Sequence, residues 1–254
     1  MPVIDTVLDE IETYYDTVPR AASTVEEVGP FTLFVADPEV GWTFYARPRL
    51  GMDHVFTADD VRRVLARQDE LGVPRALEWV DEVTPTVRSA VLEAGERAGR
   101  FPLLALPEET EVPEGIGTRV LAADDPDLAL SVGAVHAAFA GEDEVAERPI
   151  GRRAELIRDG HLMLVAAYDD GRLVGAGSAA PRGATAELMG IGVPPAYRMS
   201  GIGTALTRGL VHACRDVGVR TVFLSAYNDA AASIYRRVGF RDVGTACIFG
   251  EDDG

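Results

Sequence analysis

This sequence lacks lysine, has little cysteine and contains no long apolar run. All 24 basic residues are arginines, from which we draw no mechanism. The only cysteines, Cys214 and Cys247, match no paired metal-ligand spacing, and two thiols do not make a disulfide framework. We expect both to be small buried hydrophobic residues. Because the four histidines are scattered, we expect no metal site.

The absence of a long apolar run gives an expectation for the cellular location of the protein. No stretch approaches the roughly 20 apolar residues that span a bilayer. The N-terminus, Met1 to Thr6, has no basic start followed by an apolar stretch, as a secretion signal would. These features predict a cytoplasmic protein that has no membrane partner.

Negative charge dominates, with a formal net charge of −17. Non-specific binding to nucleic acids relies on cationic side chains that replace phosphate counterions, so we expect no nucleic-acid partner. An amine or other cationic substrate fits such a chain better, and solubility alone is the other explanation of the charge.

From about residue 117 the pattern alternates strands and helices. The strand-like segments are apolar and bounded by turn residues, and the helix-like segments carry apolar residues at helical spacing. This order predicts an α/β (α+β) domain over 117–254, with a mixed central sheet and flanking helices. We expect strands at 118–122, 161–168, 172–180, 185–193, 219–226 and 240–249, and helices at 127–140, 147–159, 201–216 and 229–238.

Residues 1–112 are interpreted as a smaller N-terminal α/β domain. The stretch Leu71–Glu78 parallels Val217–Leu224, and each is followed by a helix-like segment that ends in glycine. We infer that this domain repeats the later half of the C-terminal fold; chance similarity between two α/β units is the alternative. The segment 106–117, rich in Pro, Glu and Gly, is the expected linker.

Aromatic side chains stand out in the N-terminal domain. Core packing explains them, and an aromatic wall around an acceptor molecule is the alternative. These residues are Trp42, Phe44, Tyr45 and Trp79.

The clearest chemical signal follows the strand at 185–193. A turn with Gly201 and Gly203 leads from this strand into an amphipathic helix. A helix N-terminus presents unpaired backbone N–H groups and the positive end of the helix dipole, which suits pyrophosphate. The glycines allow close approach of phosphate oxygens, and Arg198 adds positive charge. Taken alone, a Gly-x-Gly pair is also compatible with an ordinary strand-to-helix turn.

Several other motifs are absent. The chain has no Gly-x-x-x-x-Gly-Lys-Ser/Thr loop, and its glycine turn is not the first βα turn of a dinucleotide-binding unit. It also has no Gly-x-Ser-x-Gly elbow. Nucleotide-binding and serine hydrolase functions are therefore disfavoured.

The turn and its surroundings resemble the Gcn5-related N-acetyltransferase (GNAT) family. Arg-x-x-Gly-x-Gly at 198–203 directly follows a strand that ends Ile-Gly-Val, Asn228 stands seven residues ahead of Tyr235, and Gly239-Phe240 follows. The resemblance covers about residues 117–250. It implies a GNAT-like sheet, acetyl-CoA as co-substrate and no metal.

By this resemblance, the turn holds the pyrophosphate of coenzyme A, and the pantetheine arm lies between two splayed parallel strands, 185–193 and 219–226. Met199-Ser200 departs from the glycine or basic residues that the family often has there, which lowers the expected affinity. The implied cofactor-binding residues are Ile191, Gly192, Val193, Arg198, Met199, Ser200, Gly201, Ile202, Gly203, Thr204, Asn228 and Tyr235.

Acetyl transfer to an amine needs a base, a group that polarises the thioester carbonyl, and an acid for the departing thiolate. By resemblance, Glu187 is the base and Tyr235 the acid; a plain sheet-face carboxylate and a packed helix aromatic are the alternatives. A backbone N–H near Ile191 is the expected polariser. Asn228 caps the following helix or contacts the cofactor.

These inferences predict an N-acetyltransferase that acts on the primary amine of a small molecule. We expect a monomer or homodimer whose N-terminal part shapes the acceptor pocket. The sequence leaves two alternatives open. One is a sensor or scaffold that binds acyl-CoA without turnover, and the other is a protein N-acetyltransferase.

Overall fold

The computed structural model describes residues 6–21, 23–36 and 45–250. The chain forms two compact units. The first contains the chain up to Leu103, the segment Ser225–Asn228 and the end of the chain from Asp242; the second contains Leu104–Leu224 and Asp229–Arg241. These units differ from the expected domains, 1–112 and 117–254, chiefly because the last strand belongs to the first unit.

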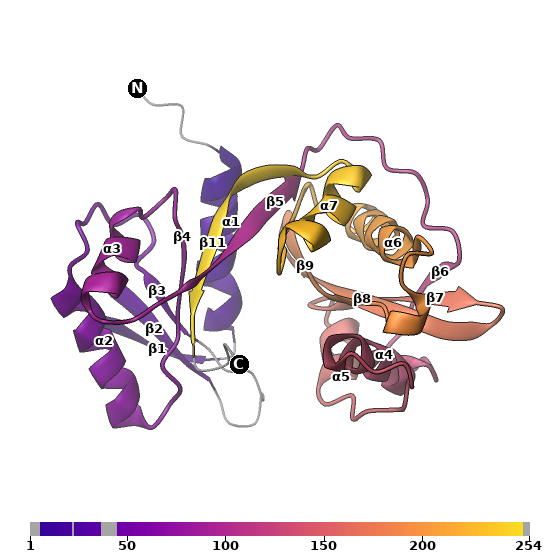
Figure 1. The fold of residues 1–254 in the computed structure, drawn as a ribbon, viewed down its shortest axis with the longest axis horizontal. Coiled ribbons are helices and arrows are strands. Elements are labelled where there is room, and N and C mark those ends of the chain that lie inside the picture. Colours follow the sequence, from indigo (N-terminus) through magenta and orange to yellow (C-terminus); the bar gives the residue numbers. More distant parts are fainter. Residues whose placement is uncertain (1–5, 22, 37–44, 251–254) are drawn as a thin grey trace. The chain divides into compact units, whose positions relative to one another are not determined.

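In the second unit strands alternate with helices, as the sequence predicts, and the fold class is confirmed. The sheet order is β10-β9-β8-β7-β6, in which β9 and β10 are parallel and the other pairs antiparallel. Figure 1 shows α4 and α5 on one face of this sheet and α6 on the other. The strands are β6 (Thr118–Val120), β7 (Met163–Asp169), β8 (Arg172–Arg182), β9 (Thr185–Gly192) and β10 (Thr221–Ser225), and the helices are α4 (Leu128–Ala140), α5 (Arg153–Arg158), the 3-10 helix η1 (Pro195–Tyr197), α6 (Ile202–Asp216) and α7 (Asp229–Val238).

The two helices that flank the site pack on the sheet for different reasons. Helix α6 is amphipathic and buries Leu206, Leu210 and Cys214. Helix α4 is rich in small residues, which allow close approach: a Cβ added to Gly192 of β9 would lie 3.0 Å from the Cα of Val135. The sheet is therefore held between one wide apolar stripe and one closely packed helix.

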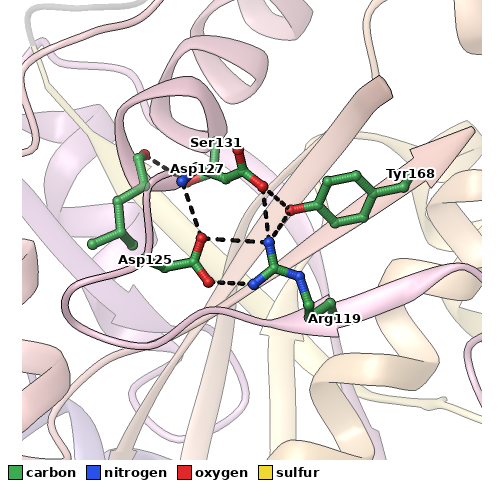
Figure 2. Close-up of polar contacts among 6 residues, drawn as sticks. Arg119, Asp125, Asp127, Ser131 and Tyr168 are labelled. Atoms are coloured by element: carbon green, nitrogen blue, oxygen red, sulfur yellow. Dashed lines mark hydrogen bonds and ion pairs between the residues drawn. The ribbon is translucent and has the colours of Figure 1, made fainter. Parts of the chain in front are cut away.

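A polar cluster fixes the start of α4 (Figure 2). Arg119 of β6 forms ion pairs with Asp125 and Asp127, and its guanidinium donates to the Tyr168 hydroxyl at 2.7 Å. Tyr168 in turn donates to Asp127, the N-cap residue, at 2.6 Å. The cluster thus joins β6, β7 and the first turn of α4.

The first unit contains β1–β4 and β11, with α1 on one face and α2 and α3 on the other (Figure 1). Its strands pair antiparallel from β1 to β3, parallel between β3 and β4, and antiparallel between β4 and β11. The elements are α1 (Thr6–Arg20), β1 (Ser23–Val28), β2 (Phe31–Ala36), β3 (Ala46–Pro48), α2 (Ala58–Leu71), β4 (Leu77–Val80), α3 (Thr86–Glu93), β5 (Gly99–Leu106) and β11 (Arg241–Phe249).

The aromatic residues of the N-terminal domain differ in their surroundings. Trp79 belongs to the buried core of the first unit and is 1% exposed, so core packing explains it. Tyr45 is half-buried and stacks beside the guanidinium of Arg47. Trp42 and Phe44 lie outside the described residues.

Strands β5 and β11 each connect to the unit that the rest of their half of the sequence does not form. β11 pairs with β4, with Cys247 opposite Trp79, whereas β5 continues past Leu103 into the second unit, where its end neighbours β10. The expected linker, 106–117, is not a loose connection. His212 of α6 lies 2.9 Å from the carbonyl oxygen of Val112, so this segment packs on α6.

Both cysteines are buried and free, as the sequence predicts. Within the described residues, no helix has the length and apolar character required to cross a membrane.

Candidate functional site

Strands β9 and β10 run parallel but pair only over their first residues. The register begins with Thr221 opposite Thr185 and ends with Phe223 opposite Glu187. Among the described residues the pairing goes no further, although β9 continues to Gly192. The backbone of β9 beyond Glu187 is thereby left available on this edge to an extended ligand.

A β-bulge bends β9 just beyond this point. Between the pairs Ser178–Met189 and Ala176–Gly192, β8 contributes one residue and β9 two. Gly190 accommodates the bulge with a φ of 56°, in the left-handed region that favours glycine. The bulge re-aims the backbone next to Ile191, the expected polarising position.

The start of α6 is open. Gly201 is its N-cap residue, with a φ of 88° and no side-chain cap, and the first helical hydrogen bond is donated by Ala205. The N–H groups of residues 202–204 therefore have no intrahelical acceptor. A Cβ added to Gly201 would meet nothing within 4 Å, and one at Gly203 would meet only Ile234, at 3.9 Å. Backbone donors and free space coincide here, as a phosphate site requires.

Arg198 braces this turn. Its Nε donates to the carbonyl oxygen of Val193 at 2.9 Å, and Nη2 donates to that of Ala138 at 2.8 Å. These bonds tie the turn to the end of β9 and to the last turn of α4. The sequence predicted a cation for pyrophosphate and missed this anchoring role, because Ala138 is 60 residues away along the chain.

The two residues after Arg198 shape the turn. Met199 is fully exposed and has a φ of 64°, a left-handed conformation that is uncommon for a side chain of this kind. The Ser200 hydroxyl donates to the carbonyl of Tyr197. The turn therefore reaches Gly201 in a defined conformation.

Tyr235 lies on α7, whose Ile234 approaches the start of α6. Its ring packs against Phe240 with centroids 6.2 Å apart. Burial raises the pKa of the Tyr235 phenol above its usual range. The phenol therefore stays protonated at neutral pH, as a proton donor must.

Two more of the predicted residues, Glu187 and Asn228, lie on β9 and just before α7. Glu187 is half-buried in the middle of β9, opposite Ala180 of β8. Asn228 is exposed, directly precedes α7, and belongs to the segment counted with the first unit. The structure thus gathers Glu187, the end of β9, the glycine turn and Tyr235 in the second unit.

Comparison with known proteins agrees with this geometry. A model described as "Acetyltransferase (GNAT) family" matches residues 134–240. The chain is 36% identical over 110 residues to the N-alpha-acetyltransferase RimI of Mycobacterium tuberculosis, a match that covers 42% of this chain and 67% of the relative. This chain belongs to the GNAT acetyltransferase family. The GNAT match includes Glu187, the glycine turn and Tyr235.

Two further similarities extend beyond the residues that the GNAT model matches. It is 32% identical over 177 residues to a mycothiol acetyltransferase of Clavibacter michiganensis, which covers 67% of this chain and 53% of the relative. The chain thus spans about half the length of that protein. A solved structure of a GCN5-related N-acetyltransferase from Kribbella flavida aligns with a TM-score of 0.71 at 20% identity, over 97% of this chain and 96% of that one. This likeness supports the GNAT fold.

Sequence reasoning missed two parts of the site. Asp143, after α4, accepts a hydrogen bond from the backbone N–H of Ala196 at 2.7 Å, beside the glycine turn. Gly190 makes the bulge. The spacing Gly190-Ile-Gly192 inside a strand was a signal for this, because glycine in a strand interior often marks a bulge or a close backbone approach.

Proposed function

We propose that this GNAT protein transfers the acetyl group of acetyl-CoA to the primary amine of a small molecule. The observation that carries the proposal is the uncapped start of α6, directly after the unpaired end of β9. The N–H groups of 202–204 would bind the pyrophosphate, and the backbone of 191–193 would bind the pantetheine arm.

The chemistry is assigned to two side chains and one backbone group. Glu187 takes a proton from the acceptor amine, directly or through water, as its nitrogen attacks the thioester carbonyl. The N–H near Ile191 stabilises the negative charge that develops on the carbonyl oxygen. As the C–N bond forms and the C–S bond breaks, Tyr235 gives its proton to the thiolate. Exchange with solvent then reprotonates Tyr235 and deprotonates Glu187, so that the products are an amide and a free thiol.

The acceptor class rests on the named relatives. Similarity to mycothiol acetyltransferases over two-thirds of the chain favours a small molecule. Similarity to RimI, an N-alpha-acetyltransferase, favours an α-amino group as the second candidate acceptor.

We also propose that the first unit is a degenerate second copy of the fold. Strands β1 to β4 pair in the same pattern as β7 to β10, and α2 stands between β3 and β4 as α6 does between β9 and β10. In this copy the helix start is closed. Thr57 and Asp60 form a reciprocal capping box, and Asp59 adds a second carboxylate in the first turn. These groups occupy the donors and repel a phosphate.

The strands of this copy also meet differently. β3 and β4 pair only at Ala46 and Leu77. At the next position, the buried Arg47 guanidinium lies 2.8 Å from Glu12 and 3.6 Å from Glu78. A charged cluster thus stands where the second unit has an unpaired strand edge, and we expect the first unit to bind no acetyl-CoA.

A calorimetric titration with acetyl-CoA tests both proposals. Wild type should bind one acetyl-CoA per chain, and Gly203→Trp should abolish binding by filling the turn. Val217→Trp, at the exposed far end of α6, is the matched control and should bind as wild type does. Two binding sites per chain would contradict the degenerate copy, and no binding would contradict the proposed function.

An amine screen then separates the enzyme from a sensor. Thiol release that depends on a small amine supports the small-molecule enzyme, and release only with peptide α-amines supports the second candidate. Saturable acetyl-CoA binding without thiol release from any amine would instead indicate the non-catalytic sensor or scaffold.

A further inference from the structure

The first unit contains a cavity of about 170 Å³ between α3 and the strands β4, β5 and β11. This volume is below the roughly 300 Å³ at which pockets for drug-sized ligands begin, so it suits a small molecule or one group of a larger one. It is lined by Trp79, Arg88, Val91, Leu92, Arg97, Ala98, Arg100 and Cys247.

The charge of this cavity is opposite to that of the protein. Three arginines line it in a chain whose net charge is −17. Arg100 is partly neutralised by Asp81, at 3.3 Å. Arg88 and Arg97 form no ion pair with any other residue that the structure describes. The excess positive charge therefore comes from Arg88 and Arg97.

One of the lining residues, Trp79, has an unsatisfied donor. Trp79 is 1% exposed, and its indole Nε1 has no hydrogen-bond acceptor among the described residues. Buried N–H groups are nearly always paired in folded proteins, so an unpaired one needs an explanation. An acceptor that enters with a ligand would provide one.

The other lining groups are apolar. Val91, Leu92 and Ala98 line the cavity together with Trp79 and offer few polar partners to the body of a ligand. Guanidinium groups bind carboxylates through paired hydrogen bonds and also stack on flat rings. This combination fits an acid with a compact apolar body.

We propose that this cavity is a binding site for a small organic carboxylate, whose anionic group is held by Arg88 and Arg97 and whose apolar body packs against Trp79. The site is separate from the glycine turn of the second unit and requires neither acetyl-CoA nor acetyl transfer.

Trp79 itself reports on the site, because the chain has only two tryptophans. In a Trp42→Phe background we would titrate sodium benzoate against Trp79 fluorescence at constant ionic strength. A saturable fluorescence change is expected with benzoate. Benzamide, which has the same shape without the charge, should bind at least tenfold more weakly. Equal responses to benzoate and benzamide, or no saturation with benzoate, would overturn the proposal.

Charge variants locate the binding. Arg88→Gln/Arg97→Gln should weaken benzoate binding at least tenfold. Arg49→Gln/Arg67→Gln removes the same charge from the same unit, at residues that do not line the cavity, and should leave binding within twofold. Equal losses in the two double variants would mean that benzoate responds only to overall charge, and the site would be rejected.

A third variant tests the indole. In Trp79→Phe a smaller phenyl ring without an N–H replaces the indole, so the rise in melting temperature that benzoate causes in wild type should shrink. An unchanged rise would show that the indole plays no part. Because none of these measurements involves acetyl-CoA, their failure leaves the proposed acetyl transfer untouched.

Discussion

Replacing Gly203 with alanine separates a cofactor role of the glycine turn from a structural one. Gly203 is the second residue of α6, and its added methyl group would make only ordinary contacts with Ile234, at 3.9 Å and 4.0 Å. Alanine favours a helix by about 1 kcal/mol over glycine in a helix interior. Near the helix end we expect Gly203→Ala to raise the free energy of unfolding by about 0.5 kcal/mol.

The effect on binding has the opposite sign. The new Cβ stands where phosphate oxygens are proposed to approach. Loss of one hydrogen bond to a charged group costs about 1.5–3 kcal/mol, so the Kd for acetyl-CoA should rise about 10- to 100-fold. A protein that is more stable yet binds less tightly cannot be explained by misfolding.

Urea unfolding and calorimetric titration measure the two effects. Gly183→Ala is the matched control: this glycine has a φ of 59° in the open β8–β9 turn, away from the site. It should lose about 1 kcal/mol of stability, because alanine is strained in the left-handed region, and keep the wild-type Kd. If Gly203→Ala also keeps the wild-type Kd, the turn does not bind the pyrophosphate.

Three further outcomes are expected. Tyr235→Phe should lower kcat about tenfold with little change in KM, because a thiolate leaves readily with modest help; an unchanged kcat in steady-state assays would remove Tyr235 from the chemistry. Burial raises the pKa of Glu78 from 4.5 to about 7, against the opposing effect of Arg47. Between these two values the folded state keeps a proton that the unfolded state releases, so the free energy of unfolding falls as pH rises from 4.5 through 7. The quantity to measure is the difference in unfolding free energy between pH 5 and pH 8, from urea unfolding. Because the Glu78 side chain is one-quarter exposed, Glu78→Gln should reduce this difference by only about 1 kcal/mol. Glu70→Gln, at an exposed position, should leave the difference unchanged. Burial raises the pKa of Cys214 to about 12, so in a Cys247→Ser variant this thiol should not react with an aromatic disulfide reagent until the protein unfolds. Rapid labelling of that native variant would contradict the burial of Cys214.

Local chemistry made part of this structure predictable. The glycine turn could be predicted because Gly201 needs a positive φ and α6 starts immediately after it, and both are properties of a few adjacent residues. The same holds for the boundaries of α7, expected and observed at Asp229–Val238. The GNAT resemblance rests on such short segments, and membership is confirmed.

The remaining features depended on residues far apart in the sequence. Nothing near Arg198 indicates that its guanidinium bonds to Ala138, and nothing near Cys247 indicates that it faces Trp79 across β4 and β11. The arginine-lined cavity forms only when α3, β4, β5 and β11 come together.

The sequence by itself determined the family, the order of helices and strands in the second unit, and the turn that begins α6, because glycine conformation, helix caps and apolar periodicity act within a few residues. Only the tertiary structure decided which unit holds the last strand, where β9 leaves β10 and what surrounds Arg47. Strand pairing and buried charge pairs are formed by the packing of distant segments, and no local pattern specifies them.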